Sequence, residues 1–247
     1  MDSQVKTMID IDNINKYIIN LDDRKDRWNH IVQEFKYMRW DYIRFPAINT
    51  GDYHGCARSH MAVAEIGIKE NLDYLLVCED DAFFMPYAKE HLRDCLSALD
   101  NIEWDMFHLG PIIHRPLNMD RNDCLIDLSN NLPPANDNHR GILGTTAMIY
   151  KKSILLEILK WPEVFDKWEN YNCMEPIDMF FSKYIYPNFK CFSGNLPIAT
   201  QIRDESTVNG GQILNQHYTV TYNWKSYINK NFPNTFFDYD YCKQNRK

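Results

Sequence analysis

The sequence predicts an α/β fold with a mostly parallel central sheet flanked by helices, and three observations support this. Short apolar runs alternate with segments of helical periodicity along most of the chain. The run "YLLVC" at Tyr74–Cys78 is apolar throughout, which is typical of a strand buried on both faces. The chain has 247 residues, 45% of them hydrophobic, so it can bury a full core. The first 110 residues then follow the order β-α-β-α-β-α-β, the outline of a nucleotide-binding architecture.

Each element follows from its local pattern. Strands are predicted at short apolar runs, namely Lys16–Leu21, Tyr42–Phe45, Tyr74–Cys78, Met106–Gly110 and Gly144–Tyr150. Helices are predicted where apolar residues recur every three or four positions, namely 28–35, Gly55–Glu70, 88–99, Lys152–Leu159 and Glu175–Ile185, the last opened by Pro176. Residues 111–140 lose this periodicity and are rich in Asn, Asp and Pro, which predicts a long loop or lid.

Composition excludes several classes of protein. No repeat or Gly/Ser linker divides the chain, so we predict one domain over 1–247, with its core at about 16–208 and an aromatic and polar tail at 218–247. The net charge of -7 argues against nucleic acid or an anionic membrane as a partner. No apolar run approaches the ~20 residues of a transmembrane helix, and acids occupy the place of a signal peptide's basic start. Seven cysteines without a C-x-x-C pair indicate reduced thiols, so we expect a cytoplasmic protein.

Three consecutive acids, Glu79, Asp80 and Asp81, follow the buried run at 74–78. Ligands of open α/β sheets bind outside the carboxyl ends of the strands, which is where these acids fall. If the backbone stays extended, Glu79 and Asp81 share one side and Asp80 faces the other. Two such carboxylates suit Mn²⁺ or Mg²⁺, which prefer oxygen ligands and relieve the mutual repulsion. The alternative is that one Asp caps the next helix while the other acids are solvated.

Basic side chains follow two other predicted elements. Arg24 and Arg27 come directly after the first strand, so they lie on the same rim as the acids, where guanidinium groups bind phosphates. Arg58 and His60 open a helix, whose N-terminus favours an anion. The alternatives are a solvated helical turn of mixed charge for the first pair and a core helix with one exposed arginine for the second.

Asp178 lies in the first turn of the helix that Pro176 opens. The helix dipole stabilises an acid there without any catalytic role. If Asp178 instead faces the acidic rim, its carboxylate is a candidate general base. The sequence leaves both interpretations open.

Six segments, taken together, resemble the family 25 glycosyltransferases, which include lipooligosaccharide and procollagen galactosyltransferases. "INLDDRKDRW" is similar to I-N-L-x-R-R-x-D-R, "GCARSH" to G-C-x-x-S-H, and "NLDYLLVCEDDAFF" to the segment that ends in E-D-D. "WDMFHLG", "GTTAMI" and "EPIDMF" resemble W-D-x-x-x-L-G, G-T-x-A-Y and P-x-D. The segments appear in family order from Tyr17 to about Val208. The chain departs from the family at Tyr53 and His54, where a Glu is common, at Met148 and at Asp23.

The resemblance implies a GT-A fold and a metal-dependent, inverting transfer of a hexose, galactose or glucose, from a UDP-sugar to a hydroxyl of a glycan or a hydroxylated protein. It also implies roles for particular residues. Asp81 and Glu79 would hold Mn²⁺ or Mg²⁺, and Asp178 would be the base. The donor would contact Asn20, Arg24, Arg27, Arg58, His60, Glu79 and Asp80. A virus-encoded protein, or one peripheral to a site of glycan assembly, fits this interpretation.

Two other functions stay open on the sequence alone. A metal-dependent nucleotidyl- or phosphotransferase would also use acids at a strand end, although the chain has no G-x-x-x-x-G-K-[ST] loop. A catalytically silent carbohydrate-binding module would keep the fold without the chemistry.

Overall fold

The computed structural model describes residues 9–113, 124–129, 142–162 and 176–202. Its strands are β1 (Asn15–Asn20), β2 (Ile43–Pro46), β3 (Tyr74–Glu79), β4 (Ala82–Phe84), β5 (Met106–His108), β6 (Ile112–Ile113), β7 (Leu125–Asp127), β8 (Ile142–Leu143), β9 (Ala147–Lys151), β10 (Cys191–Gly194) and β11 (Ala199–Gln201). Its helices are η1 (Ile11–Asn13), α1 (Lys25–Met38), α2 (His54–Lys69), α3 (Ala88–Leu99), α4 (Lys152–Ile158), α6 (Ile177–Phe180), η3 (Phe181–Ile185) and α7 (Tyr186–Asn188).

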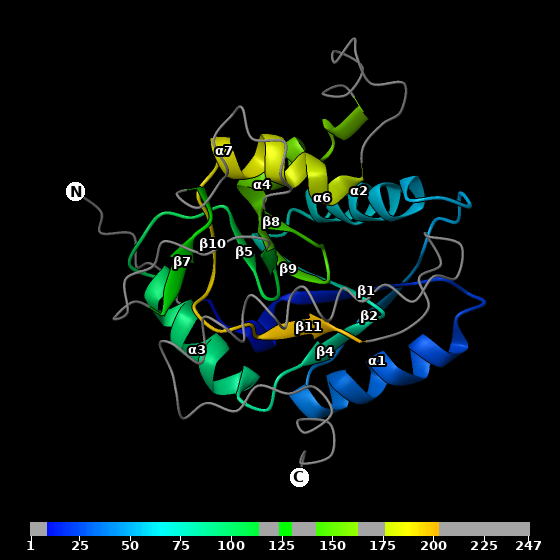
Figure 1. The fold of residues 1–247 in the computed structure, drawn as a ribbon, viewed down its shortest axis with the longest axis horizontal. Coiled ribbons are helices and arrows are strands. Elements are labelled where there is room, and N and C mark those ends of the chain that lie inside the picture. The colour runs from blue at the N-terminus through cyan, green and yellow to red at the C-terminus, as the bar shows by residue number, and fades with distance from the viewer. Residues whose placement is uncertain (1–8, 114–123, 130–141, 163–175, 203–247) are drawn as a thin grey trace.

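A seven-stranded sheet lies at the centre, in the order β2-β1-β3-β9-β5-β10-β7. Strands β2, β1, β3, β5 and β10 run in one direction, while β9 and β7 run in the other. Figure 1 shows α1 and α3 on one side of this sheet and α2, α4 and α6 on the other. The predicted α/β class with a mostly parallel sheet flanked by helices is therefore confirmed.

The apolar run in β3 explains why this strand is central. Leu75, Leu76, Val77 and Cys78 are all fully buried, because β1 and β9 pair with its two edges and helices cover both faces. Large aromatic side chains contribute to the core, among them Phe35 of α1 and Tyr150 of β9, neither of which is exposed. The prediction that this strand is buried on both faces is confirmed.

The strand predicted at 144–150 is observed as β9, which lies antiparallel between β3 and β5, a direction that the sequence left open. The structure corrects the sequence prediction at another place. The segment 111–140, predicted as a loop, contains β7 at an edge of the central sheet and β6, which pairs with β8. Such strands of two or three residues are too short to show periodicity. The rest of that segment and the tail 218–247 lie outside the described residues.

The chain changes sheets at the acidic triplet. Glu79 is the last residue of β3, Asp80 and Asp81 form a turn, and β4 then pairs with β11 instead of continuing in the central sheet. The backbone amide of Ile202 donates to the carbonyl of Asp81 at 2.8 Å, so the strand β11 segment covers the turn. Asp80 and Asp81 are consequently buried, with only 7% and 9% of their surface exposed. Within the described residues, no helix is both long and apolar enough to cross a bilayer.

Candidate functional site

The parallel pairing of β1 with β3 brings Asn20 to the acidic triplet. Ile19 lies opposite Glu79 in the sheet, so the residues that follow them meet at the carboxyl edge. The Nδ2 of Asn20 donates to Oδ2 of Asp80 at 2.7 Å, and both side chains are buried. Asn20 also receives two hydrogen bonds from Arg44 on β2, at 2.9 and 3.2 Å, through its Oδ1. This chain of contacts fixes the Asp80 carboxylate on the rim of the sheet.

Arg27 joins the two aspartates of the turn. Its Nη1 lies 3.2 Å from Oδ1 of Asp80 and 3.2 Å from Oδ2 of Asp81, and all three side chains are nearly buried. Burial raises the pKa of Asp80 although Asn20 and Arg27 favour its charged form. Burial and the nearby charge of Glu79 raise the pKa of Asp81 to about 8, against the opposing effect of Arg27. One guanidinium therefore only partly offsets two carboxylates.

The second oxygen of Asp81 has no partner. Its Oδ1 is buried and accepts no hydrogen bond from any described residue. A buried carboxylate oxygen left without a donor is costly, so native proteins rarely leave one without a ligand, water or ion. This oxygen is therefore the atom of the turn whose hydrogen-bonding capacity is unused among the described residues.

We expect that replacing Arg27 with methionine lowers the free energy of unfolding by about 3–5 kcal/mol, because it leaves two buried carboxylates without a cationic partner. Without Arg27 the pKa values of both acids rise further, so the loss is larger at pH 8, where the unfolded carboxyls are ionised, than at pH 4. Urea unfolding at both pH values measures this. Arg93→Met, at a side chain 75% exposed, is the matched control and changes stability by less than about 0.5 kcal/mol. A pH-independent loss would contradict the explanation.

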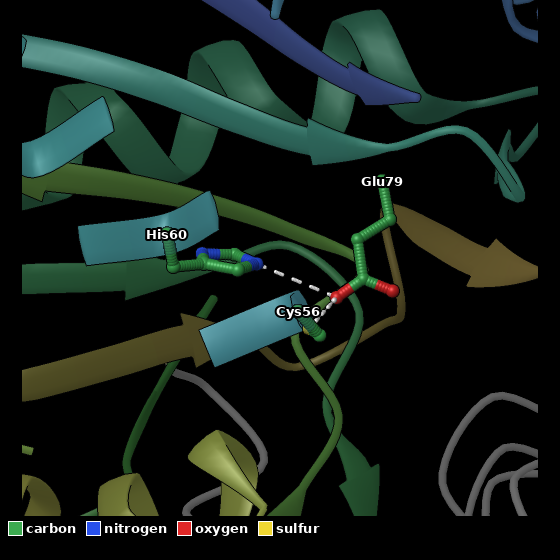
Figure 2. A group of neighbouring side chains, drawn as sticks. All are labelled: Cys56, His60 and Glu79. Atoms are coloured by element: carbon green, nitrogen blue, oxygen red, sulfur yellow. Dashed lines mark hydrogen bonds and ion pairs between the residues drawn. The ribbon is translucent and has the colours of Figure 1, made fainter. Parts of the chain in front are cut away.

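Glu79 contacts a different group of side chains, namely Cys56, His60 and Thr145. Figure 2 shows Glu79 with the first two. Its Oε1 accepts a short hydrogen bond from Oγ1 of Thr145 and lies 3.4 Å from Nε2 of His60 and 3.5 Å from Sγ of Cys56. Burial opposes ionisation of Glu79, yet its interactions with His60 and the hydrogen bonds from Thr145 and Cys56 lower the pKa of its carboxyl. The turn at Asp80 and Asp81 breaks the extended backbone, so the triplet divides into Glu79 on one side and the aspartate pair with Arg27 on the other.

A hydrogen bond to Tyr150 orients the imidazole of His60. Its Nδ1 lies 2.8 Å from the hydroxyl of Tyr150 on β9, and neither side chain is exposed. This contact turns Nε2 of the imidazole toward Glu79, as Figure 2 shows. His60 is therefore a buried, oriented side chain at the carboxyl edge of the sheet, whereas Arg58, two residues earlier, is exposed.

Asp178 lies at the start of α6 next to the Glu79 group. Its Oδ2 accepts a hydrogen bond from the backbone amide of Gly144 at 3.3 Å. Gly144 has a φ of +86°, a conformation that a side chain would strain, and this turn aims its amide at Asp178. The next residue, Thr145, binds Glu79 through its hydroxyl, so successive residues of the chain contact the two acids. Asp178 thus faces the rim of the sheet.

The structure does not bring every predicted donor contact together. Arg24 binds Asp26 of its own helical turn at 2.7 Å and lowers the pKa of that carboxyl to about 2. Arg58 lies on the exposed face of α2, away from the buried residues Ala57, Ser59 and His60. Asn20, Arg27, His60, Glu79, Asp80, Asp81 and Asp178 do lie along the carboxyl edge.

Sequence analysis missed three residues of this site. Arg44 follows the same rule as Asn20, since it comes near the end of a strand parallel to β1, and this signal was available in the sequence. Its guanidinium binds both Asn20 and Asp22 and lies 5.2 Å from the ring centre of Trp28. Thr145 and Cys56 lie in the segments that resemble G-T-x-A-Y and G-C-x-x-S-H, but their contact with Glu79 had no local signal, because Glu79 lies 66 and 23 residues away.

Comparison with known proteins agrees with this geometry. The sequence model of "Glycosyltransferase family 25 (LPS biosynthesis protein)" matches residues 50–119. This range contains Asp80 and Asp81 as well as Cys56, His60 and Glu79, but not Thr145. A "Glycosyltransferase 25 family member" from Aedes aegypti is 27% identical over 38% of this chain and 20% of its own length. The chain therefore spans about a fifth of that relative. These two matches confirm the resemblance to family 25 and support a glycosyltransferase.

Two solved structures are similar in arrangement at low identity. One is a glycosyltransferase involved in the glycosylation of the major capsid of PBCV-1, with a TM-score of 0.44 and 13% identity over 73% of this chain and 80% of that one. The other is A197 from STIV, with a TM-score of 0.44 and 12% identity over 77% of this chain and 86% of that one. Similarity at this level assigns no function to the present chain.

Proposed function

We propose that the chain is a GT-A-type glycosyltransferase that uses Mn²⁺ or Mg²⁺ to transfer a hexose, galactose or glucose, from a UDP-sugar to a hydroxyl group, with inversion. The single observation that supports this most is the buried Oδ1 of Asp81, which has no hydrogen-bond partner among the described residues and lies in a turn whose two carboxylates both contact Arg27 of α1. The turn and α1 together offer an oxygen ligand for a hard cation and a guanidinium for phosphate.

The residues present fit a hard divalent cation. Asp81 would hold it through Oδ1, and Glu79 offers Oε2, because the hydrogen bonds from described residues all reach its Oε1. When bound, the cation supplies positive charge to the diphosphate as the bond to the sugar breaks. Its charge would also favour the ionised form of Asp81, whose pKa burial raises.

The side chains around the triplet would position the donor. Asn20 binds the Asp80 carboxylate, and Arg44 binds Asn20. A phosphate group could replace Asp80 or Asp81 as the partner of the Arg27 guanidinium. Arg24 and Arg58 would join only after their side chains move, since Arg24 binds Asp26 and Arg58 points to solvent. Donor binding thus rests mainly on the residues that pack against the acidic turn.

Asp178 would accept the proton of the acceptor hydroxyl. The Gly144 amide donates to its Oδ2 and so positions the carboxylate, which can act as a base toward a hydroxyl group. Asp178 lies on α6, an element separate from the turn that carries Asp80 and Asp81. The acceptor would be a glycan or a hydroxylated protein side chain.

The test is a panel of nucleotide sugars incubated with the protein and Mn²⁺. A glycosyltransferase releases UDP and free hexose slowly from its own donor, because water replaces the missing acceptor. The other two interpretations give different results. A nucleotidyltransferase would release pyrophosphate or a nucleoside monophosphate, and a silent carbohydrate-binding module would release nothing. Either of these outcomes, with folded protein, would overturn the proposal.

A further inference from the structure

We propose that Cys56, His60 and Glu79 form a second metal site for a borderline-soft divalent cation of the zinc class. It uses Oε1 of Glu79, whereas the proposed hard-cation position at Asp81 would use Oε2 of the same residue. The three side chains offer one sulfur, one nitrogen and one oxygen, and these ligand atoms all lie within 4.8 Å of one another. Figure 2 shows the thiol and the imidazole directed at the same carboxylate oxygen. This inference does not depend on the proposed transferase activity.

Two of the three distances between ligand atoms match a tetrahedral ion, and the third is within 4.8 Å. Zinc bonds of about 2.0–2.3 Å at tetrahedral angles place neighbouring ligand atoms roughly 3.3–3.6 Å apart. In the structure, Oε1 of Glu79 lies 3.5 Å from Sγ of Cys56 and 3.4 Å from Nε2 of His60. An ion could therefore replace the hydrogen-bonding protons with little movement of the side chains.

The local sequence and the second layer of contacts favour the same arrangement. Cys56 and His60 are four residues apart on α2, so they lie on one face of the helix. The hydroxyl of Tyr150 binds Nδ1 of His60 at 2.8 Å, which leaves Nε2 for a metal, as outer partners of ligating histidines commonly do. Among the described residues, no lysine or arginine forms an ion pair with Glu79, so the charge of this carboxylate is available to a cation.

Chemistry separates this site from the aspartate turn. A thiol and an imidazole select zinc, cobalt or similar ions, whereas Asp81 offers only oxygen, which suits Mn²⁺ or Mg²⁺. Three protein ligands leave a fourth position for water or another ligand. The hydroxyl of Thr145, which binds Oε1 of Glu79, lies 3.9 Å from the Cys56 sulfur. Cys56 is only partly buried and the Glu79 side chain is 19% exposed, so an ion can enter.

Cobalt titration of the full, metal-stripped chain tests the site, because a thiolate bound to Co²⁺ gives a charge-transfer band in the near ultraviolet. We expect one equivalent of Co²⁺ to produce this band, zinc to abolish it, and Cys56→Ser to remove it while weakening Co²⁺ binding at least about tenfold. Cys124→Ser, at another partly buried thiol, is the matched control and keeps the band. No band in the wild-type protein, or a band that survives in Cys56→Ser, would overturn the site.

Alkylation gives a measurement that needs no variant. Zinc should slow the reaction of Cys56 with N-ethylmaleimide at least about tenfold while leaving Cys124 unaffected, as peptide mass spectrometry can show. Equal rates at Cys56 with and without zinc would contradict the proposal.

Asp81→Asn should keep the cobalt band but lose the response to Mn²⁺ and UDP. Failure of the second site alone would leave the Mn²⁺ and UDP response of the wild type intact, and failure of the proposed function alone would leave the cobalt band intact.

Discussion

Replacing Asp81 with asparagine should eliminate the stabilisation that Mn²⁺ and UDP together give the wild-type protein, and should reduce metal affinity by about two orders of magnitude or more. Residues that merely support metal ligands typically change affinity 10–100-fold, so losing a ligand oxygen should cost at least as much. Asparagine keeps the size of the side chain and can still accept from Arg27, which now lies 3.2 Å from Oδ2. Melting temperature against Mn²⁺ concentration, with and without UDP, measures the effect.

The same variant should have the opposite effect on the metal-free protein at high pH. The pKa of Asp81 in the folded protein is raised to about 8 from an ordinary value of 3.8. Stability from this carboxyl is therefore present below pH 4 and is lost as pH rises toward 8, by up to about 1.4 kcal/mol per pH unit. Asparagine does not ionise, so metal-free Asp81→Asn should be more stable than the wild type at pH 8 and nearly equal to it at pH 4.

The control for both results is Asp73→Asn, at an exposed residue directly before the opposite end of β3. This variant should follow the wild type in metal response and in pH dependence. If metal-free Asp81→Asn were less stable than the wild type at pH 8, the buried carboxylate would not be the cost that the structure indicates. An unchanged response to Mn²⁺ and UDP would place the cation elsewhere.

Replacing Asp178 with asparagine should reduce sugar transfer by about 10²–10⁴-fold, the usual contribution of a general base, while donor and metal binding change little. The reason is geometric. Asp178 lies at the start of α6 and contacts Gly144, whereas Asp80 and Asp81 contact Arg27 on α1. Removing a base on one element should therefore spare binding on another.

Two measurements on one protein sample separate chemistry from binding in this variant. Transfer is followed by UDP release with acceptor present, and donor binding by calorimetry with UDP-sugar and Mn²⁺. Asp94→Asn, at a side chain 63% exposed, provides the control and should leave both unchanged. Equal losses of transfer and donor binding would refute the role of Asp178 as a base.

The sequence predicted most of the elements near the site because each carries its own period or apolar run. The helix 54–69 and the strand 74–79 are examples: the helix is displaced by one residue at each end from its predicted bounds, and the strand is one residue longer at its carboxyl end. Short strands escaped prediction because two or three residues carry no period. β7, in a segment predicted as a loop, forms an edge of the central sheet. The antiparallel direction of β9 also escaped, since direction depends on how the chain returns and not on local pattern.

The sequence by itself determined that Arg27 and the triplet share one rim, because parallel strands end at the same edge of a sheet. Only the tertiary structure decided how the triplet divides. A turn at Asp80 and Asp81 sends both carboxylates to Arg27, while Glu79 meets Cys56 and His60 from a neighbouring helix. Local periodicity fixes which edge a side chain reaches. Contacts between residues distant in the chain fix which carboxylate oxygen has no hydrogen-bond partner among the described residues, and the proposed cation position rests on that oxygen.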